Sequence, residues 1–291
     1  MFAVIQPARD SSASLEQMSR RIGCAALALA AASLAGAARA APGPRALIPR
    51  EPAKLAQTLA ETKNDLARAI DAWRESDEPR ATHEVTLDAL YEQRIELLLA
   101  ARPRLAAATL PRLPEEIAHD VRTNLVAKRE LWRLTPVSGR RRFRTGRALP
   151  PKTLLRYYRQ AEARFGVAWN VLAGVNFVES AFNKLRNDSA TGAQGPMQFM
   201  PATWRVYGLG GNVHDPHDAI LGAANYLHAN GAPRNNRRAL FRYNPSALYV
   251  DAVLRYARRI RSDPHAFYEY YAWQVFVRTR TGLRRITGPG L

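Results

Sequence analysis

Apolar residues recur at helical spacing along the first half of the chain. Between positions 53 and 76 they follow one another in steps of three, four or seven, so they fall on one face of a predicted helix. This face consists of Leu55, Leu59, Leu66, Ile70 and Trp73. Similar patterns at 85–99 and 114–134 predict further helices. We therefore expect residues 41–137 to form a helical hairpin or small bundle.

The second half of the chain also has helical periodicity and no run with the alternation of a strand before position 263. Short helices are predicted at 151–165, 167–182, 201–207, 216–230, 234–242 and 246–261. Helix boundaries are legible in places: Asp215 precedes Pro216 at a first helical position, and Asn230 and Gly231 follow the other end. The pattern predicts an all-α domain over residues 151–262.

Two segments depart from the helical pattern. Residues 138–150 begin with glycines and five arginines and have no apolar period, which is typical of a basic linker and predicts a domain boundary. Residues 263–291 contain a stretch at 271–279 that is rich in aromatic and β-branched residues. We interpret this last segment as an extended tail whose aromatic side chains pack against the domain.

The start of the chain is typical of an export signal. Arg20 and Arg21 precede a fifteen-residue run of apolar and small residues at 24–38, and a small-residue cleavage pattern ends at Ala40. A membrane-spanning helix needs roughly 20 apolar residues. We therefore expect residues 1–40 to be removed and the protein to be exported to the periplasm, cell wall or medium, with no transmembrane segment. Because residues 1–17 are polar, our hypothesis is that translation begins at Met18.

The cysteine content and the net charge of residues 41–291 exclude some kinds of site and indicate which polymers the protein binds. The only cysteine, Cys24, lies in the predicted signal, so residues 41–291 have no disulfide, thiol nucleophile or thiolate metal site. Those residues carry 39 basic and 23 acidic side chains, a net charge of +16. An exported protein with such a surface is expected to meet anionic polymers of the cell envelope and not nucleic acid. An arginine-rich host proteome is the alternative explanation of the charge.

Glu179 is the strongest candidate for a catalytic group. It lies in the sequence VESAFN at 178–183, in the last turn of a predicted helix whose apolar stripe includes Val175 and Phe182. The stripe also includes Val178, and one residue is about 100° of helical rotation, so Glu179 lies at the margin of the stripe. Apolar neighbours and the negative end of a helix dipole favour a protonated carboxyl, which a general acid needs. The alternative is an ordinary solvated glutamate.

Two further segments supply polar groups that could act with Glu179. The loop GPMQFMP at 195–201 contains a glycine that permits close approach of the backbone and Gln198, which is both a donor and an acceptor. Tyr243 and Asn244 add a phenol and an amide shortly before the capping residue Ser246. A carboxylate, a glycine-bounded loop and a Tyr-Asn pair in this order favour a site that cleaves a glycan.

With these segments the chain resembles the lytic murein transglycosylases of the lysozyme-like superfamily, which also holds goose-type lysozymes. The resemblance covers roughly residues 154–260. The sequences GPMQFMPATW at 195–204, DPHDAI at 215–220 and AANYL at 223–227 are most similar to the membrane-bound B-type branch. The resemblance implies a lysozyme-like, goose-type helical catalytic domain without a cofactor.

The resemblance also implies the reaction and the role of each residue. Glu179 would protonate the oxygen between N-acetylmuramic acid and N-acetylglucosamine in peptidoglycan, and then remove the proton of the muramic C6 hydroxyl to give a 1,6-anhydro end. Met197 and Gln198 would line the groove. Ser180 would hold a sugar or Glu179. Tyr243 and Asn244 would orient Glu179.

Some alternatives remain open at the level of sequence. If Asp188 faces Glu179 it could hold a water, and the enzyme would then hydrolyse the glycan as goose-type lysozymes do. A protein that binds or organises peptidoglycan without cleaving it is compatible with the same groove and charge. The segment 210–214 lacks the acids of the calcium loop that some relatives carry, and Asp215 and Asp218 are explained as helix caps, so we expect no metal.

Overall fold

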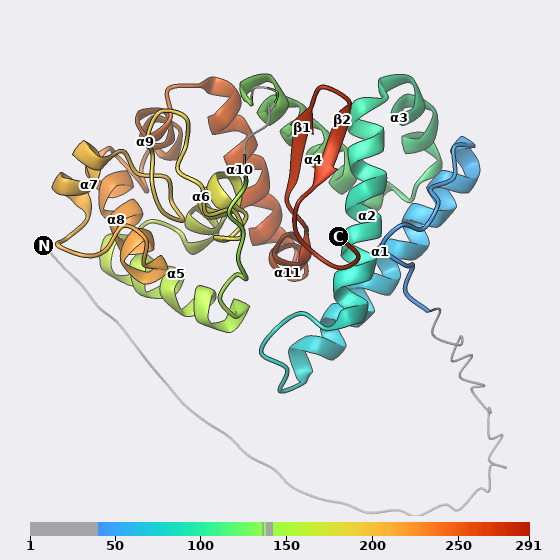
Figure 1. The fold of residues 1–291 in the computed structure, drawn as a ribbon, viewed down its shortest axis with the longest axis horizontal. Coiled ribbons are helices and arrows are strands. Elements are labelled where there is room, and N and C mark those ends of the chain that lie inside the picture. The colour runs from blue at the N-terminus through green and yellow to red at the C-terminus, as the bar shows by residue number, and fades with distance from the viewer. Residues whose placement is uncertain (1–39, 136, 138–141) are drawn as a thin grey trace, which may run out of the picture. The chain divides into compact units, whose positions relative to one another are not determined.

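The computed structural model describes residues 40–135, 137 and 142–291 (Figure 1). The predicted signal peptide lies outside the described residues, apart from Ala40, as do residues 138–141 of the predicted linker. The described part contains helices α1 to α11 and one small sheet of two strands, which confirms the predicted all-α class. Within these ranges, no helix has both the length and the apolar character needed to cross a membrane.

Four α-helices form the N-terminal region. They are α1 (Pro52–Glu75), α2 (His83–Ala101), α3 (Pro103–Thr109) and α4 (Glu115–Leu134), with a 3₁₀ turn at Leu110–Arg112 before α4. The start of α1 is fixed by the carboxylate of Glu51, which accepts from the backbone N–H groups of Ala53 and Lys54 at 2.9 and 2.7 Å. The sequence predicted α1, α2 and α4, whereas α3 was missed.

Six helices follow in the second half, close to their predicted positions. They are α5 (Pro151–Phe165), α6 (Trp169–Ser180), α7 (Pro201–Tyr207), α8 (Pro216–Ala229), α9 (Asn236–Tyr243) and α10 (Ala247–Ser262). The predicted cap of α8 is present, since Asp215 accepts from the backbone N–H groups of His217 and Asp218 at 2.8 and 3.1 Å. Gly166 ends α5 with φ of 71°, a left-handed conformation that glycine adopts at little cost.

Helix α6 lies at the centre of the second half and positions the site. It packs against α5, α8 and α10, and all of its residues from Asn170 to Phe177 are buried (Figure 1). Such a helix, apolar on nearly all sides, is stable only inside a core. Its last turn, which carries Glu179, is the part that reaches the surface.

The N-terminal helices share this core with the second half of the chain. Helix α4 packs along α10, and the second half of α1 contributes Leu66, Ile70 and Trp73 to the same cluster of buried side chains as α5, α6, α8 and α10. A smaller cluster joins the first half of α1 to α2, α3 and α4. The N-terminal region therefore braces α10 directly.

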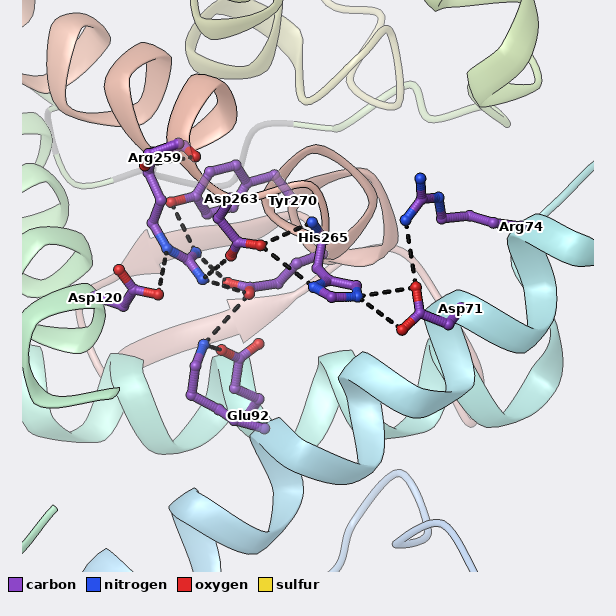
Figure 2. Close-up of polar contacts among 11 residues, drawn as sticks. Asp71, Arg74, Glu92, Asp120, Arg259, Asp263, His265 and Tyr270 are labelled. Carbon is purple, nitrogen blue, oxygen red and sulfur yellow. Dashed lines mark hydrogen bonds and ion pairs between the residues drawn. The ribbon is translucent and has the colours of Figure 1, made fainter. Parts of the chain in front are cut away.

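Buried charges also connect the two halves where α1, α2, α4 and α10 meet (Figure 2). Arg259 of α10 pairs with both carboxylate oxygens of Glu269, at 2.6 and 2.8 Å, and with Asp120 of α4 at 3.2 Å. Lys63 of α1 lies 2.6 Å from Glu92 of α2 and 3.3 Å from Glu269. Burial acts to raise the pKa of Glu269, but the charges of Arg259 and Lys63 outweigh it and lower this pKa to about 2.

The C-terminal tail is only partly extended. Its first part forms helix α11 (Ala266–Ala272), which was not predicted, and β1 (Phe276–Thr279) and β2 (Gly282–Arg285) then form an antiparallel hairpin. The expected packing of its aromatic residues is confirmed, because Tyr271 and Trp273 are buried. The indole N–H of Trp273 donates to Glu92 at 3.0 Å, which anchors the tail to α2.

Candidate active site

Glu179 ends helix α6 at a sharp reversal of the chain. The next three residues, Ala181, Phe182 and Asn183, have φ of 50°, 60° and 67°, a left-handed region that residues other than glycine rarely adopt. The reversal buries Phe182 completely in the core and leaves Glu179 partly buried at the rim. Strained backbone of this kind persists where the surrounding packing fixes it, and it clusters at functional sites.

Ser180 holds the glycine loop against the end of α6. Its hydroxyl donates to the carbonyl of Pro196 at 2.6 Å and accepts from the backbone N–H of Asn183 at 2.9 Å. The amide of Asn176 donates to the same Pro196 carbonyl at 2.9 Å, and Tyr158 in turn donates to Asn176 at 2.6 Å. Ser180 is 2% exposed, so in this structure it contacts the loop and neither Glu179 nor solvent.

The loop at 194–199 is a tight hairpin that only glycine permits. A side chain at Gly195 would place its Cβ 1.9 Å from the carbonyl oxygen of Val213, and φ at this position is 73°. Gln194 and Phe199 exchange backbone hydrogen bonds of 2.8 and 2.9 Å across the turn. Gln198 lies at the tip, partly buried, and its amide nitrogen donates to the carbonyl of Gly195 at 2.9 Å. This bond leaves the side-chain oxygen of Gln198 available as an acceptor.

Met197 and Tyr243 fix the loop from inside. The side chain of Met197 is fully buried, so it packs behind the loop and does not line an open groove in this structure. The hydroxyl of Tyr243 donates to the carbonyl of Met197 at 2.5 Å. Tyr243 was expected to orient Glu179, whereas its hydrogen bond goes to the loop.

The residue that contacts Glu179 is Tyr249, which the sequence reasoning missed. Its hydroxyl donates to Oε1 of Glu179 at 2.6 Å. Tyr249 lies in the first turn of α10, where Ser246 caps the helix, and it is 3% exposed. Six positions separate it from Tyr243, so the available signal was a second tyrosine on the buried face of the helix that follows the Tyr-Asn pair.

The surroundings of Glu179 change its acidity. Burial raises the pKa of Glu179 to about 7, while the hydrogen bond from Tyr249 acts in the opposite direction. Burial and the nearby Glu179 raise the pKa of Tyr249 well above its usual range, so this phenol stays protonated and donates. At neutral pH both forms of the Glu179 carboxyl are therefore populated, as one group that gives and later takes a proton requires.

Asn244 is a second member of the candidate site, after Gln198, with free hydrogen-bonding capacity. It ends α9, where its backbone N–H donates to the carbonyl of Leu240 at 2.9 Å. The side chain is partly exposed and its amide makes no hydrogen bond within the described part of the chain. It can therefore both donate to and accept from a ligand.

The other acids considered from the sequence have partners elsewhere. Asp188 pairs with Arg144, with 3.8 Å between Nη2 and Oδ1, on an exposed part of the surface. Asp215, His217 and Asp218 bring possible metal ligands within 4.8 Å of one another. However, Asp215 accepts backbone N–H groups of α8, and Asp218 accepts the backbone N–H of Asn212 at 2.9 Å. These contacts explain the acids as caps of a helix and a loop.

A comparison with protein-family models shows which family the site-bearing part of the chain matches. Residues 156–262 match the family model of the transglycosylase SLT domain. The chain contains a transglycosylase SLT domain. The match covers α5 from its second turn, α6 with Glu179, the glycine loop, and α7 to α10, so every candidate site residue lies within it.

This domain identifies the protein as a peptidoglycan lytic transglycosylase of the lysozyme-like superfamily. Proteins with an SLT domain act on peptidoglycan outside the cytoplasm. No curated protein and no solved structure gave a significant match to the chain.

Proposed function

We propose that the protein is an exported lytic transglycosylase that cleaves the bond between N-acetylmuramic acid and N-acetylglucosamine in peptidoglycan with Glu179 as its single acid and base. The observation that carries this proposal is the pairing of Glu179 with Tyr249 at the rim of a buried helix, with a pKa of about 7. A carboxyl with this pKa is well suited to transfer protons in both directions near neutral pH.

In the first step protonated Glu179 gives its proton to the glycosidic oxygen. The bond between C1 of N-acetylmuramic acid and this oxygen breaks, and N-acetylglucosamine leaves with a new hydroxyl. The N-acetyl group of the substrate assists at the anomeric carbon. The resulting carboxylate of Glu179 keeps its hydrogen bond from Tyr249, which stabilises the charge that forms on transfer.

In the second step the carboxylate of Glu179 takes the proton of the C6 hydroxyl of the same muramic acid. The C6 oxygen bonds to C1 and closes the 1,6-anhydro ring, and Glu179 is again protonated. No water and no second carboxyl enter the balance of this reaction. The proposal needs no cofactor, because both proton transfers use one side chain.

The remaining site residues would act through binding and positioning. Gln198 and Asn244 would contact the sugars, since each has hydrogen-bonding capacity at the surface. Ser180, Met197 and Tyr243 would shape the binding groove by holding the loop at 194–199, through the Ser180 to Pro196 and Tyr243 to Met197 bonds. Tyr249 would orient Glu179.

The proposal includes the organisation of the whole chain. Residues 1–40 would serve as the export signal, 41–137 as a helical brace, 138–150 as the basic linker, 151–262 as the catalytic domain and 263–291 as the tail. The net charge of +16 over residues 41–291 would favour adhesion to anionic polymers of the envelope.

Mass spectrometry of the soluble products tests this proposal. Residues 41–291 are incubated with purified peptidoglycan, and Glu179→Gln is run alongside. Products lighter by one water molecule than hydrolysed muropeptides are expected from the wild type and not from the variant. Glu75→Gln, a change at an exposed glutamate of α1, is the matched control and should release the same products as the wild type.

Other products would change the conclusion. Hydrated reducing ends would indicate a muramidase and direct attention to Asp188. Binding to peptidoglycan without release, by the wild type as well as by Glu179→Gln, would indicate a protein that holds the wall without cutting it.

A further inference from the structure

Helix α9 presents an arginine-rich face beside the candidate active site. Between Asp218 and Asp251 the sequence contains no acid but has four arginines, at 234, 237, 238 and 242. Arg238, Phe241 and Arg242 are three and four positions apart, so they lie on one face of α9. They line an open groove of about 810 Å³ whose other wall includes Pro245 and Val250.

Of these four arginines only Arg237 forms an ion pair with a residue in the described ranges, and Arg238 and Arg242 are the two unpaired ones that line the groove. Arg237 pairs with Asp251 at 2.7 Å. Arg238 and Arg242 are exposed and form no ion pair with any residue in the described ranges. Phe241 lies between them in sequence and leaves 48% of its surface exposed. The face thus offers two free guanidinium groups and one apolar surface.

The groove is lined by α9 and the start of α10, the two helices that carry Tyr243 and Tyr249 of the candidate site. Pro245 directly follows Asn244, and Val250 directly follows Tyr249, whose hydroxyl lies 2.6 Å from Glu179. The lining of the groove thus includes the residues next in sequence to Asn244, which would hold the sugar, and to Tyr249, which would orient the acid.

We propose that the α9 groove binds the peptide stem of the glycan strand that is being cleaved, through the carboxylates of that peptide. This inference rests on the proposed function, since the stem is attached to the lactyl group of N-acetylmuramic acid and accompanies the sugar into the site. A guanidinium recognises a carboxylate with two parallel hydrogen bonds, and Phe241 matches the apolar side chains of a peptide. Arg238 and Arg242 would then determine the preference for glycan that carries peptide.

The test compares two substrates with the double variant Arg238→Ala/Arg242→Ala. One substrate is glycan with its stems, and the other is the same glycan after an amidase has removed them. The wild type is expected to have a higher kcat/KM on the first. The variant should lose about tenfold on that substrate, mainly through KM, and should keep the wild-type value on stripped glycan, because two exposed ion pairs contribute modestly.

A control variant separates this role from net charge. Arg258→Ala/Arg261→Ala removes two exposed arginines of α10 that do not line the groove, and it should behave as the wild type on both substrates. An equal loss for the two double variants would assign the effect to overall charge. An equal loss by Arg238→Ala/Arg242→Ala on both substrates would place glycan, not peptide, in the groove. Either result overturns the inference.

A binding measurement keeps the inference testable if no cleavage is detected. Stems released by the amidase are labelled and titrated with Glu179→Gln by fluorescence anisotropy. Binding that weakens with Arg238→Ala/Arg242→Ala or with methyl-esterified stems supports the inference even if the proposed catalysis fails. Competition by a phosphodiester wall polymer, with no binding of the stem itself, would assign the groove to a different polyanion.

Discussion

At the scale of single residues, the chemistry depends on the pair formed by Glu179 and Tyr249. The hydrogen bond from Tyr249 lowers the pKa of Glu179 against the effect of burial, so the two influences together set it near 7. Ser180, which is the neighbour of Glu179 in sequence, contributes instead to the loop. The side chain that donates to Glu179 thus comes from α10, which is distant in sequence, and not from the neighbours of Glu179 in α6.

We expect Tyr249→Phe to shift the pH dependence of cleavage. Without this donor the carboxylate of Glu179 is less stable, so its pKa rises further above 7. The general acid must be protonated, so the fall of kcat/KM with rising pH should occur about one pH unit higher than in the wild type. The value of kcat/KM at the optimum should fall about tenfold. A pH profile measures both effects.

Tyr256→Phe is the matched control for this change. Tyr256 is also a buried tyrosine of α10, and its hydroxyl has no hydrogen-bond partner among the residues that the structure describes. Its variant should keep the wild-type pH profile. An unchanged profile in Tyr249→Phe as well would exclude Tyr249 as the residue that sets the acidity of Glu179.

The partly buried carboxylate of Glu179 should also destabilise the folded protein in alkaline solution. The folded pKa of about 7 lies above the ordinary pKa of a glutamate, 4.5, so folding favours the protonated form. This penalty is absent below pH 4.5 and develops as the pH rises through 7, where the folded protein must hold a charge that the unfolded chain solvates. Glu179→Gln should therefore be more stable than the wild type at pH 8, by about 1–3 kcal/mol, and about equal at pH 4.

Denaturant unfolding of both proteins at the two pH values measures this difference. A variant that is less stable than the wild type at pH 8 would show that the carboxylate is well solvated in the folded protein.

At the scale of elements, the glycine loop at 194–199 determines where Gln198 and the Met197 carbonyl lie. Gly195→Ala should destabilise the protein by about 2–4 kcal/mol and abolish cleavage, because its Cβ would collide with the carbonyl of Val213 at 1.9 Å. Thermal unfolding and product release measure the two effects.

Gly192→Ala is the control for backbone strain alone. Its φ is 88°, but a Cβ there would meet no atom within 4 Å. It should cost only about 1–2 kcal/mol and leave cleavage largely intact. Equal effects of the two variants would mean that the contact with Val213 has no role of its own.

The elements themselves were largely predictable from the sequence. Helices α5 and α7 have the predicted bounds, because proline at the first position and glycine after the end mark both of them. Helix α3 was missed since Pro103 and Pro111 interrupt the apolar period around it, and α11 because its aromatic residues are typical of strands. Local signals fix boundaries, but tertiary packing decides the state of aromatic and proline-rich segments.

The candidate site was predictable in part. Its segments could be found because each has a short local pattern. Their contacts could not, since Glu179 and Tyr249 are 70 positions apart and a tyrosine on the buried face of α10 resembles an ordinary core residue. The same holds for Met197, which was expected at the groove and is buried behind the loop.

At the scale of the whole molecule, buried charges join the N-terminal helices to the SLT domain. Arg259→Met should destabilise the protein by about 3–5 kcal/mol, because it leaves Glu269 and Asp120 without their main partner. Arg258→Met, an exposed neighbour, should change stability by less than about 0.5 kcal/mol. Denaturant unfolding of both variants compares them, and equal stabilities would contradict a structural role for the network.

The same network gives a pH dependence in acid. The folded pKa of Glu269, about 2, lies below the ordinary pKa of a glutamate, 4.5. Its contribution to stability is therefore fully present above pH 4.5 and is lost as the pH falls toward 2. The charge of Arg259 lowers the pKa of Glu269. In Arg259→Met the loss of stability between pH 5 and pH 2 should therefore be smaller than in the wild type. Unfolding curves between pH 5 and pH 2 would show it, and parallel curves for the two proteins would assign acid unfolding to other groups.

In the proposed reaction Glu179 gives its proton to the glycosidic oxygen and then takes the proton of the C6 hydroxyl, and water takes no part. The most direct test is cleavage of purified peptidoglycan by residues 41–291 in water enriched in heavy oxygen, with mass spectrometry of the released muropeptides. We predict 1,6-anhydro products that carry no heavy oxygen and that are absent with Glu179→Gln. Heavy oxygen at C1 of N-acetylmuramic acid would show that water attacks this carbon, and would contradict the account.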